Sequence, residues 1–373
     1  MADRPEFVVA PTESPAPEAD RLKVLEDPGF GVHFTDHMAV VDHTTADGWH
    51  NGRVVQYAPI ALDPAACVLH YAQEIFEGMK AYRHADGSIW TFRPEKNAAR
   101  LQRSARRLAM PEVPEEIFLE AIRQLAQIDQ AWVPEAAEGS ETSLYLRPFQ
   151  IGTEAFLGVR PSQASQFYVI ASPSGPYFPS GVKPVDIWVS RNYHRAGFGG
   201  TGFAKCGGNY AASLAAQVEA GEHGCAQVLF LDDREEKWVE ELGGMNLFFV
   251  FSDGSIVTPP TSGTILEGVT RMSLVELGRD AGHEVTERPI SLDEVTTGIA
   301  DGTITEVFAC GTAAVITPVG SFRTEEDTWT VGGEGRSEDL DESYPVTMTL
   351  RRTLTDIQYG RAEDTKGWMH RLV

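Results

Sequence analysis

The chain has 373 residues, a length that suggests two domains. Of these residues 42% are hydrophobic and 23% are charged, a composition typical of a globular protein. This composition excludes wholesale disorder, a collagen-like repeat and a small scaffold held together by disulfides. The 31 basic and 54 acidic residues give a net charge of −23, so we expect no nucleic acid and no membrane surface among the partners.

The N-terminal segment up to Asp20 is rich in Pro, Glu, Asp and Ala and lacks the apolar core of a signal peptide. We therefore expect residues 1–26 to be a disordered tail. No run of about 18 apolar residues occurs, so the sequence predicts no transmembrane helix. Four widely spaced cysteines favour a cytoplasmic location; they are Cys67, Cys206, Cys225 and Cys310.

Alternating and apolar runs predict a small N-terminal α+β domain over residues 27–173. A hairpin is expected at residues 84–87, because this segment ends in Asp-Gly and lies between two apolar runs. Pro94 is placed to begin a helix, and a second helix is expected over residues 115–127. The predicted strands cover residues 38–41, 53–57, 79–83, 88–92, 143–150 and 166–172.

A dense Pro, Gly and Ser stretch predicts an inter-domain linker at residues 174–184, followed by a large C-terminal domain over residues 185–373. A polar segment at residues 324–343 is expected to be a surface excursion. Strands are predicted at residues 185–190, 227–231, 246–251 and 305–310. Helices are predicted at residues 210–220 and 270–281, the latter capped by Gly282.

The most informative segment is residues 197–210, in which six glycines surround Lys205, one of only seven lysines in the chain. Glycine allows the backbone to approach a ligand closely. A nucleotide-binding P-loop is not expected, because the order is Ala-Lys-Cys where that motif needs Gly-Lys-Ser/Thr. A lysine whose amine condenses with a carbonyl group fits the segment better. The alternative is a glycine-rich turn with a solvated lysine.

Several segments together resemble the branched-chain amino-acid aminotransferases, which are fold type IV pyridoxal-phosphate enzymes. The resemblance covers roughly residue 29 to the C-terminus. It implies a mixed α+β (α/β) fold of two domains, with the cofactor at the domain interface and the Schiff-base lysine on the C-terminal domain. The matching segments are residues 70–82, 92–101, 104–108, 143–148, 197–210, 241–246, 268–271 and 306–313.

The resemblance implies pyridoxal 5′-phosphate as the cofactor and assigns a role to three residues. Lys205 would form the Schiff base and move a proton at the substrate Cα. Glu241 would pair with the pyridine nitrogen, and Tyr210 would donate to the phenolic oxygen. The remaining cofactor-binding positions are Arg100, Arg195, Val269, Thr270 and Thr312.

Some positions near these motifs stay open or receive a structural interpretation. Helical spacing alone does not distinguish Arg100 from Arg103 and Arg107, which share one helix face. Lys80 lacks a glycine-rich surrounding and is interpreted as structural. Cys206 and Cys310 are expected to be buried packing residues. No metal site is expected, since no third ligand accompanies the histidines at positions 33 and 37.

For the substrate, the resemblance implies that the amides of Thr312 and Ala313 hold the α-carboxylate, with Tyr71 and Arg147 nearby. The expected walls of the side-chain pocket are aromatic, and Val159 of the partner subunit would close the pocket in a homodimer. These walls are Phe34, Phe76, Tyr145 and Tyr177. The CxxC pair of animal members is absent, because Ala314 and Thr317 occupy its positions.

The implied reaction is ping-pong transfer of an amino group between L-Leu, L-Ile or L-Val and 2-oxoglutarate, giving glutamate and branched-chain 2-oxo acids. Two alternatives remain at this point. The same scaffold serves a D-amino-acid aminotransferase or an aminodeoxychorismate-type lyase, and a non-catalytic binding protein with a decayed site is the other possibility. The preference among the three donors stays open, as does a role in synthesis or breakdown.

Overall fold

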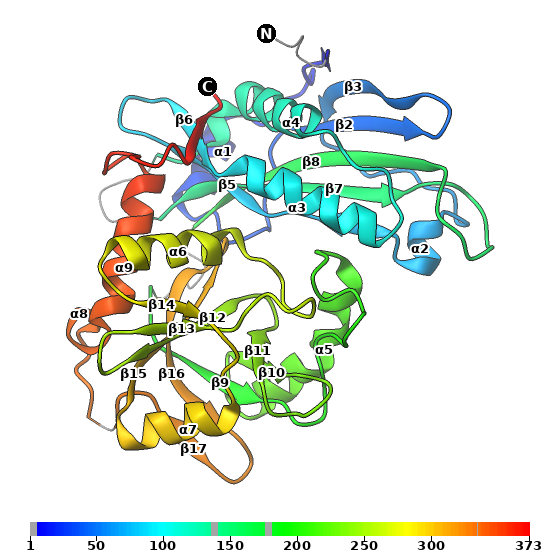
Figure 1. The fold of residues 1–373 in the computed structure, drawn as a ribbon. Coiled ribbons are helices and arrows are strands. Elements are labelled where there is room, and N and C mark those ends of the chain that lie inside the picture. The colour runs from blue at the N-terminus through cyan, green and yellow to red at the C-terminus, as the bar shows by residue number, and fades with distance from the viewer. Residues whose placement is uncertain (1–5, 136–140, 176–180, 334) are drawn as a thin grey trace. The chain divides into compact units, whose positions relative to one another are not determined.

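The computed structural model describes residues 6–135, 141–175, 181–333 and 335–373 (Figure 1). The chain divides into two compact units. Unit 1 comprises Met1–Pro179, Ala204–Gly207 and Asp356–Val373, and unit 2 comprises Ser180–Phe203 and Gly208–Thr355. Much of the predicted linker, together with Tyr177, lies outside the described residues.

Unit 1 is built on one sheet in which all neighbouring strands are antiparallel, except that β1 runs parallel to β3. The predicted strands of the first half are confirmed. In spatial order the strands are β1 (Val8–Val9), β3 (Gly48–Gln56), β2 (His37–Thr44), β8 (Ala164–Ser174), β7 (Ser143–Gly152), β5 (Met79–Arg83), β6 (Ile89–Phe92) and β18 (Met369–Arg371), with β4 (Glu74–Phe76) beside β7. The predicted hairpin joins β5 to β6, and Gly87 in its turn has φ 85°.

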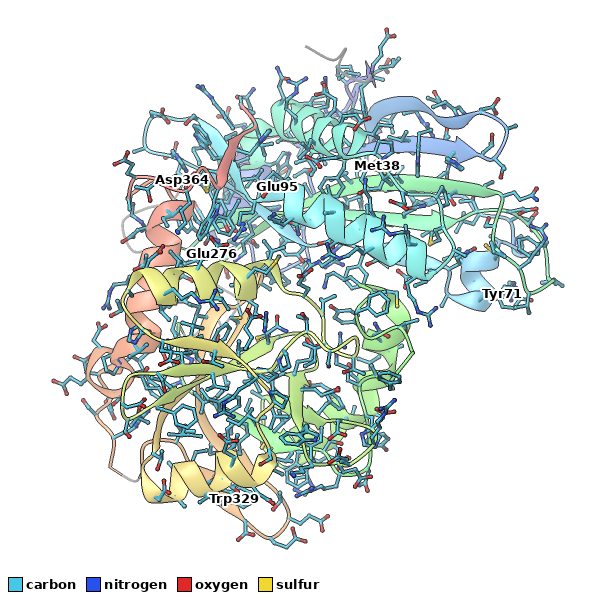
Figure 2. All side chains as sticks on the ribbon, in the orientation of Figure 1. Met38, Tyr71, Glu95, Glu276, Trp329 and Asp364 are labelled. Carbon is cyan, nitrogen blue, oxygen red and sulfur yellow. The ribbon has the colours of Figure 1, made fainter. Side chains whose placement is uncertain are left out.

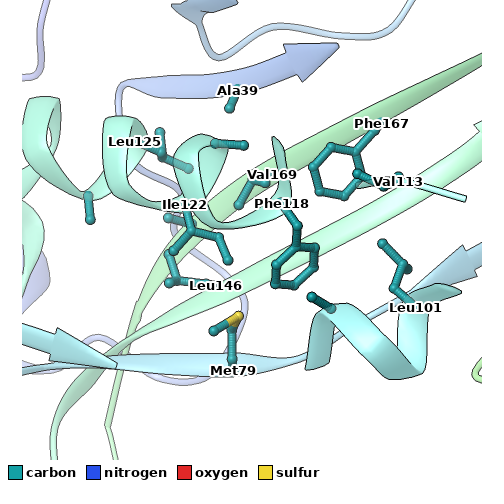
Figure 3. Packing of buried hydrophobic residues seen from close by; sticks show 14 of the residues in the cluster. Ala39, Met79, Leu101, Val113, Phe118, Ile122, Leu125, Leu146, Phe167 and Val169 are labelled. Carbon is teal, nitrogen blue, oxygen red and sulfur yellow. The ribbon is translucent and has the colours of Figure 1, made fainter. Parts of the chain in front are cut away.

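The core of unit 1 lies where two amphipathic helices cover the sheet. Both predicted helices are confirmed, as α3 (Pro94–Arg107) and α4 (Glu115–Ile128). On α4, Phe118, Ile122 and Leu125 recur at helical spacing and are fully buried. Figure 3 shows these side chains directed at β8 and at Met79 of β5. The shorter helices of this unit are α1 (Glu18–Glu26), α2 (Cys67–Tyr71) and the 3-10 turn η1 (Gln130–Trp132).

The two ends of the chain differ from the prediction. Residues 1–5 lie outside the described part, but the rest of the expected disordered tail forms β1 and α1. This segment is held by two side chains at the start of β2: the Ala16 N–H donates to Asp36 and the Thr12 N–H to His37 Nε2, both at 2.9 Å. At the other end, β18 extends the sheet beside β6, so residues 356–373 belong to unit 1 and not to the predicted C-terminal domain.

Unit 2 is also built on one sheet, in which β9 runs parallel to its neighbours β10 and β16, and β13 to β14. All four strands predicted for the second half are confirmed. In order the strands are β11 (Val239–Leu242), β10 (Gln227–Leu231), β9 (Val185–Val189), β16 (Val315–Arg323), β15 (Ile304–Gly311), β12 (Asn246–Phe251), β13 (Ile256–Thr258) and β14 (Val285–Glu287), with β17 (Thr328–Thr330) beside β16.

The helices of the second half include both predicted ones. They are α5 (Gly207–Glu222), α6 (Val269–Asp280), α7 (Leu292–Asp301), α8 (Leu340–Ser343) and α9 (Pro345–Gln358). Gly282 follows the end of α6 with φ 88°, as predicted for a glycine cap. The predicted surface excursion at residues 324–343 contains β17 and α8, and most of its described residues are exposed or half-buried. Over the described ranges, no helix is long and apolar enough to cross a membrane.

Candidate active site

Lys205 belongs to unit 1 and not to the predicted C-terminal domain, and its backbone is bonded to strand and helix residues of unit 1. The Lys205 N–H donates to Ser104 Oγ of α3 at 2.9 Å, and its carbonyl accepts the Phe76 N–H at 3.0 Å. Two residues later, the Gly207 N–H donates to Glu74 Oε1 at 2.5 Å. A Cβ at position 207 would lie 2.0 Å from that oxygen, so the approach requires glycine. The lysine is therefore presented from a fixed stretch of backbone.

The Lys205 side chain belongs to a cluster with Phe76, Tyr145 and Arg147, which we call the lysine cluster. Lys205 Nζ lies 4.6 Å from the centroid of the Phe76 ring, and Arg147 Cζ lies 4.9 Å from the same centroid. Arg147 Nη2 donates to the Tyr145 hydroxyl at 3.1 Å. Within the described part of the chain, the buried Arg147 Nε has no hydrogen-bond partner. The cluster thus combines an amine, a guanidinium with an unused donor and aromatic walls.

Glu74 adds a carboxylate next to this cluster. Burial raises the pKa of Glu74, while the Gly207 N–H and the charge of Arg147 act in the opposite direction. The sequence analysis gave this residue no role. The sequence held one indication of a role for Glu74, which is its position in the segment of residues 70–82, just before Phe76.

Burial distinguishes Arg100 from Arg103 and Arg107, the other two candidates on α3. Arg100 is 4% exposed, whereas Arg103 is half-buried and Arg107 is exposed. Arg100 forms a bidentate ion pair with Glu77, with Nε 2.8 Å from Oε1 and Nη2 2.6 Å from Oε2. Asn97 Nδ2 donates to the same carboxylate at 2.8 Å. Glu77, which the sequence analysis missed, therefore orients Arg100.

Phe34 and Tyr71, two further predicted pocket residues of unit 1, contact residues outside the lysine cluster. Phe34 is 37% exposed and stacks on Tyr57, with the ring centroids 5.1 Å apart. Tyr71, at the end of α2, donates its hydroxyl to the Leu157 carbonyl (Figure 2). Val159 follows two residues later and is 87% exposed. The structure thus brings together three of the predicted pocket side chains with Lys205 and places Phe34 on Tyr57.

In unit 2, Glu241 is a buried carboxylate held by several donors. Arg195 Nη1 lies 3.0 Å from Glu241 Oε1, and the Leu266 N–H donates to the same oxygen at 2.7 Å. Asn246 Nδ2 lies 3.4 Å from Oε2. Arg195 Nη1 also donates to the carbonyl of Thr264 at 3.0 Å. These contacts fix the orientation of the carboxylate on β11.

The neighbouring Glu240 has different partners, as expected for adjacent residues of one strand. The Thr264 hydroxyl donates to Glu240 Oε1, and Oε2 is buried without a partner among the residues that the structure describes. Burial raises the pKa of Glu240, and the Thr264 hydrogen bond opposes this shift. Glu240 and Thr264 line a cavity of about 220 Å³ whose walls include Phe198 and Trp238.

The N-terminus of α6 provides a site for an anion. Val269 and Thr270 are its first two residues and are buried, and no side-chain cap is found in the described residues for the first turn after Gly268. Free amides at such a helix end bind phosphate groups. Asn246 Nδ2 donates to the Leu266 carbonyl at 3.0 Å, and a Cβ on Gly268 would lie 2.2 Å from Asn246 Oδ1. Asn246, missed by the sequence analysis although it ends the segment of residues 241–246, therefore contacts both Glu241 and the approach to this helix.

The turn at residues 243–245 lies next to Tyr210 and next to Gly311, the last residue of β15. A Cβ on Gly244 would be 3.8 Å from Tyr210 Cε1, and one on Gly311 would be 3.4 Å from Met245 Cγ. Gly311 directly precedes Thr312 and Ala313, which form the loop between β15 and β16. The structure therefore places Tyr210, and the strand end that leads into Thr312 and Ala313, next to one turn of unit 2.

Burial supports the structural interpretation of the cysteines near the motifs. Cys206 and Cys310 are 4% and 1% exposed, so their prediction as packing residues is confirmed. Burial raises the pKa of the Cys310 thiol to about 12, which keeps it protonated and unreactive. Lys80 is also buried, and its carbonyl accepts the Thr91 hydroxyl at 2.9 Å.

Comparison with known proteins places this arrangement in a family. Residues 74–322 match the family amino-transferase class IV. The chain is 56% identical over 370 residues to the branched-chain-amino-acid aminotransferase of Mycolicibacterium smegmatis, covering 98% of each chain. A crystal structure of the Escherichia coli branched-chain amino acid aminotransferase superposes with a TM-score of 0.74 at 28% identity, covering 91% of this chain and 99% of that one.

A second solved structure bears on the cofactor. The branched-chain amino acid aminotransferase of T.th. complexed with N-(5′-phosphopyridoxyl)-L-glutamate has a TM-score of 0.71 at 29% identity, covering 90% of this chain and 99% of that one. The predicted fold class, transaminase activity and pyridoxal 5′-phosphate cofactor are confirmed by these matches, which do not favour the alternatives. The chain belongs to amino-transferase class IV and, within it, to the branched-chain-amino-acid aminotransferases.

Proposed function

We propose that the chain transfers the amino group between L-Leu, L-Ile or L-Val and 2-oxoglutarate in a ping-pong reaction. The observation that carries this proposal is the lysine cluster, where Arg147 keeps an unused Nε donor beside the Phe76 ring. The aromatic rings suit a branched aliphatic side chain, and the guanidinium suits the second carboxylate of glutamate. The names of the M. smegmatis and T.th. relatives agree with this pair of substrates.

The residues present fit pyridoxal 5′-phosphate, because they supply an amine, a held carboxylate and a helix N-terminus for a phosphate. Bound pyridoxal 5′-phosphate supplies an electron sink for the charge left when the substrate Cα loses its proton. Glu241 would support protonation of the pyridine nitrogen, with Arg195 fixing the carboxylate. Tyr210 would donate to the phenolic oxygen. The phosphate would be held by the Val269 and Thr270 amides, with Arg100 and the Thr312 hydroxyl as further donors.

Lys205 would bind the cofactor aldehyde and, once released by substrate, would move the proton at the substrate Cα. The two backbone hydrogen bonds of Lys205, to Ser104 and from Phe76, support this role because they keep the amine in place during the reaction. Lys80 has no such role in this proposal, because it is buried on β5.

For the substrate, we propose that the Thr312 and Ala313 amides receive the α-carboxylate. Tyr71, Phe34 and Tyr177 would complete the pocket begun by the lysine cluster. A homodimer is proposed in which Val159 of the partner subunit closes the pocket, because Val159 and the nearby Leu157 are both exposed apolar residues, at 87% and 67%. A cytoplasmic location is proposed on the four free, buried thiols.

The test combines a substrate panel with chemical mapping. Leucine, isoleucine and valine should each give glutamate from 2-oxoglutarate, and D-leucine should not. Activity with D-leucine alone would favour a D-amino-acid aminotransferase. Borohydride reduction of the loaded enzyme, followed by peptide mapping, should place the pyridoxyl group on Lys205. Lys205→Ala should abolish transfer, and a label on Lys80 would overturn the assignment.

A further inference from the structure

The loop joining β15 to β16 contains an unusual backbone conformation. The loop has three residues, 312–314, between the paired Gly311 and Val315. Such hairpin loops commonly end in a left-handed residue, where glycine is favoured. Here the left-handed residue is Val315, the first residue of β16 after the loop, with φ 60° and a buried side chain. A β-branched residue is strained in this conformation, so neighbouring groups must hold it there.

The group that holds it is Arg351 of α9. Arg351 Nη1 donates to the Ala314 carbonyl at 3.3 Å and also to the Ile316 carbonyl. The Ala314 carbonyl belongs to the peptide directly before Val315, and the Ile316 carbonyl belongs to the strand residue that follows it. If Val315 relaxed to negative φ, the peptide that carries the Ala314 carbonyl would rotate relative to β16, and Arg351 could no longer bind both carbonyls. Arg351 is 5% exposed, so water would not replace the lost hydrogen bond readily.

Helix α9 is itself fixed to the strand that leads into the loop. Glu306 of β15 accepts the N–H groups of Val346 and Thr347 at 3.1 and 2.8 Å, and the Thr347 hydroxyl at 2.7 Å. A buried carboxylate at a helix N-terminus satisfies donors that lack partners inside the helix. This contact holds the helix that carries Arg351 against β15.

We propose that Arg351 is a positioning residue that holds the loop in the form in which the Thr312 and Ala313 amides receive the substrate α-carboxylate. The inference rests on the proposed function of these amides. Arg351 acts through the carbonyls around Val315 and does not need to touch the substrate. Its loss should therefore weaken recognition of the carboxylate and leave recognition of the aliphatic side chain unchanged.

The first test replaces Arg351 and compares the variant with a replacement of the neighbouring Arg352. Arg351→Met should raise the KM of leucine and of 2-oxoglutarate about tenfold, the loss of one hydrogen bond to a charged group, with little change in kcat. Arg351→Lys, which keeps a charged donor, should restore part of the affinity. The control is Arg352→Met, because Arg352 lies next on the same helix and pairs with Asp341 at the surface. This control should match the wild type.

Two probes separate the carboxylate from the rest of the substrate. The Kd of 4-methylpentanoate, an unreactive acid with the carbon skeleton of leucine, should rise by the same factor in Arg351→Met. The slow reaction of 3-methylbutylamine, which lacks the carboxylate, should be unchanged. An unchanged Kd for the acid, or an equal loss with the amine, would overturn the proposal.

The second test removes the backbone strain at Val315 in the variant that lacks Arg351. Glycine adopts positive φ freely, so adding Val315→Gly to Arg351→Met should recover much of the lost carboxylate affinity. No recovery would contradict the role of Arg351. Should Arg351→Met not fold, Arg351→Lys and the double variant give the same comparison. A wild-type chain without transaminase activity would refute the proposed function alone. In that case, the unfolding free energies of the single and double variants at Val315 and Arg351 would test whether Arg351 holds the loop. Additive effects of the two substitutions would overturn this role.

Discussion

Arg195 and Glu241 form an ion pair in unit 2, with Nη1 3.0 Å from Oε1 and both side chains at most 2% exposed. In such surroundings an ion pair is costly to break, because the remaining charge is left without a partner or water. The Leu266 N–H on the same oxygen adds a third group to the arrangement. In the role proposed for Glu241, a carboxylate held this way would meet a protonated pyridine nitrogen at no further cost of reorientation.

Glu241→Gln is therefore expected to slow turnover by about tenfold to hundredfold, equivalent to one charge-assisted hydrogen bond of about 1.5–3 kcal/mol. Steady-state kinetics with leucine and 2-oxoglutarate measure this effect. The matched control is Glu240→Gln, since its carboxylate contacts Thr264 and not Arg195. Wild-type turnover in Glu241→Gln together with a collapse in Glu240→Gln would show that the neighbouring residue has the role.

The Glu77–Arg100 pair predicts a large effect on stability. Glu77→Gln leaves the buried Arg100 guanidinium without its counter-charge and should lower the free energy of unfolding by about 3–5 kcal/mol. Glu112→Gln breaks the exposed pair with Arg106, also on α3, and should cost about 0–1 kcal/mol. Urea unfolding followed by circular dichroism compares the two. Equal losses would mean that burial does not govern the strength of the Arg100 pair.

Local patterns predicted those parts of the fold that depend on neighbouring residues. The Asp-Gly turn before β6 and the glycine after α6 were predictable, because each needs a particular backbone conformation at one position. The strand β18 and the helix α1 were not, since both depend on side chains or strand edges that are distant in sequence. Their own composition carries little signal.

The residues of the candidate site likewise fall into those that the sequence could predict and those that it could not. Motifs indicated Lys205, Glu241 and Arg147, and the structure adds the contacts that orient them. Glu77 and Asn246 were missed because their function is to hold another residue, which spacing along the chain does not reveal. The positive φ of Val315 is also invisible in the sequence, which places a β-branched residue where glycine is expected.

Glu240 predicts a pH dependence of stability. Burial raises its pKa in the folded protein above the ordinary value of 4.5, so the folded chain keeps this proton to a higher pH than the unfolded chain. The stability from holding the proton is fully present below the unfolded pKa and is lost as the pH rises through the raised pKa. Glu240→Gln cannot titrate, so its free energy of unfolding relative to the wild type should rise with pH across this window.

A variant of opposite sign controls that measurement. Burial acts to raise the pKa of Asp232, but four backbone N–H groups donate to its carboxylate and the net shift is downward. Its contribution to stability is therefore present at higher pH and is lost on acidification. The free energy of unfolding of Asp232→Asn should thus fall relative to that of the wild type as the pH rises. Urea unfolding over a series of pH values tests both. Slopes of the same sign would contradict the assigned origin of the shifts.

Arg147 and Tyr145 offer a way to recognise two different substrates in turn. They alternate along β7, so both side chains lie on one face, and their contact of 3.1 Å keeps the guanidinium beside the aromatic wall. An apolar wall alone would reject the second carboxylate of glutamate, because burying that charge without a partner is costly. Arg147→Leu should therefore reduce kcat/KM for 2-oxoglutarate by about tenfold to hundredfold, and for leucine much less.

Each half-reaction is measured separately, by following the absorbance change of the loaded enzyme with one substrate at a time. Arg160→Leu is the matched control, since Arg160 is an exposed arginine of the same unit that lies over Phe156 and pairs with Glu154. Equal losses in both halves of the Arg147 variant would mean that this arginine holds the α-carboxylate common to both substrates.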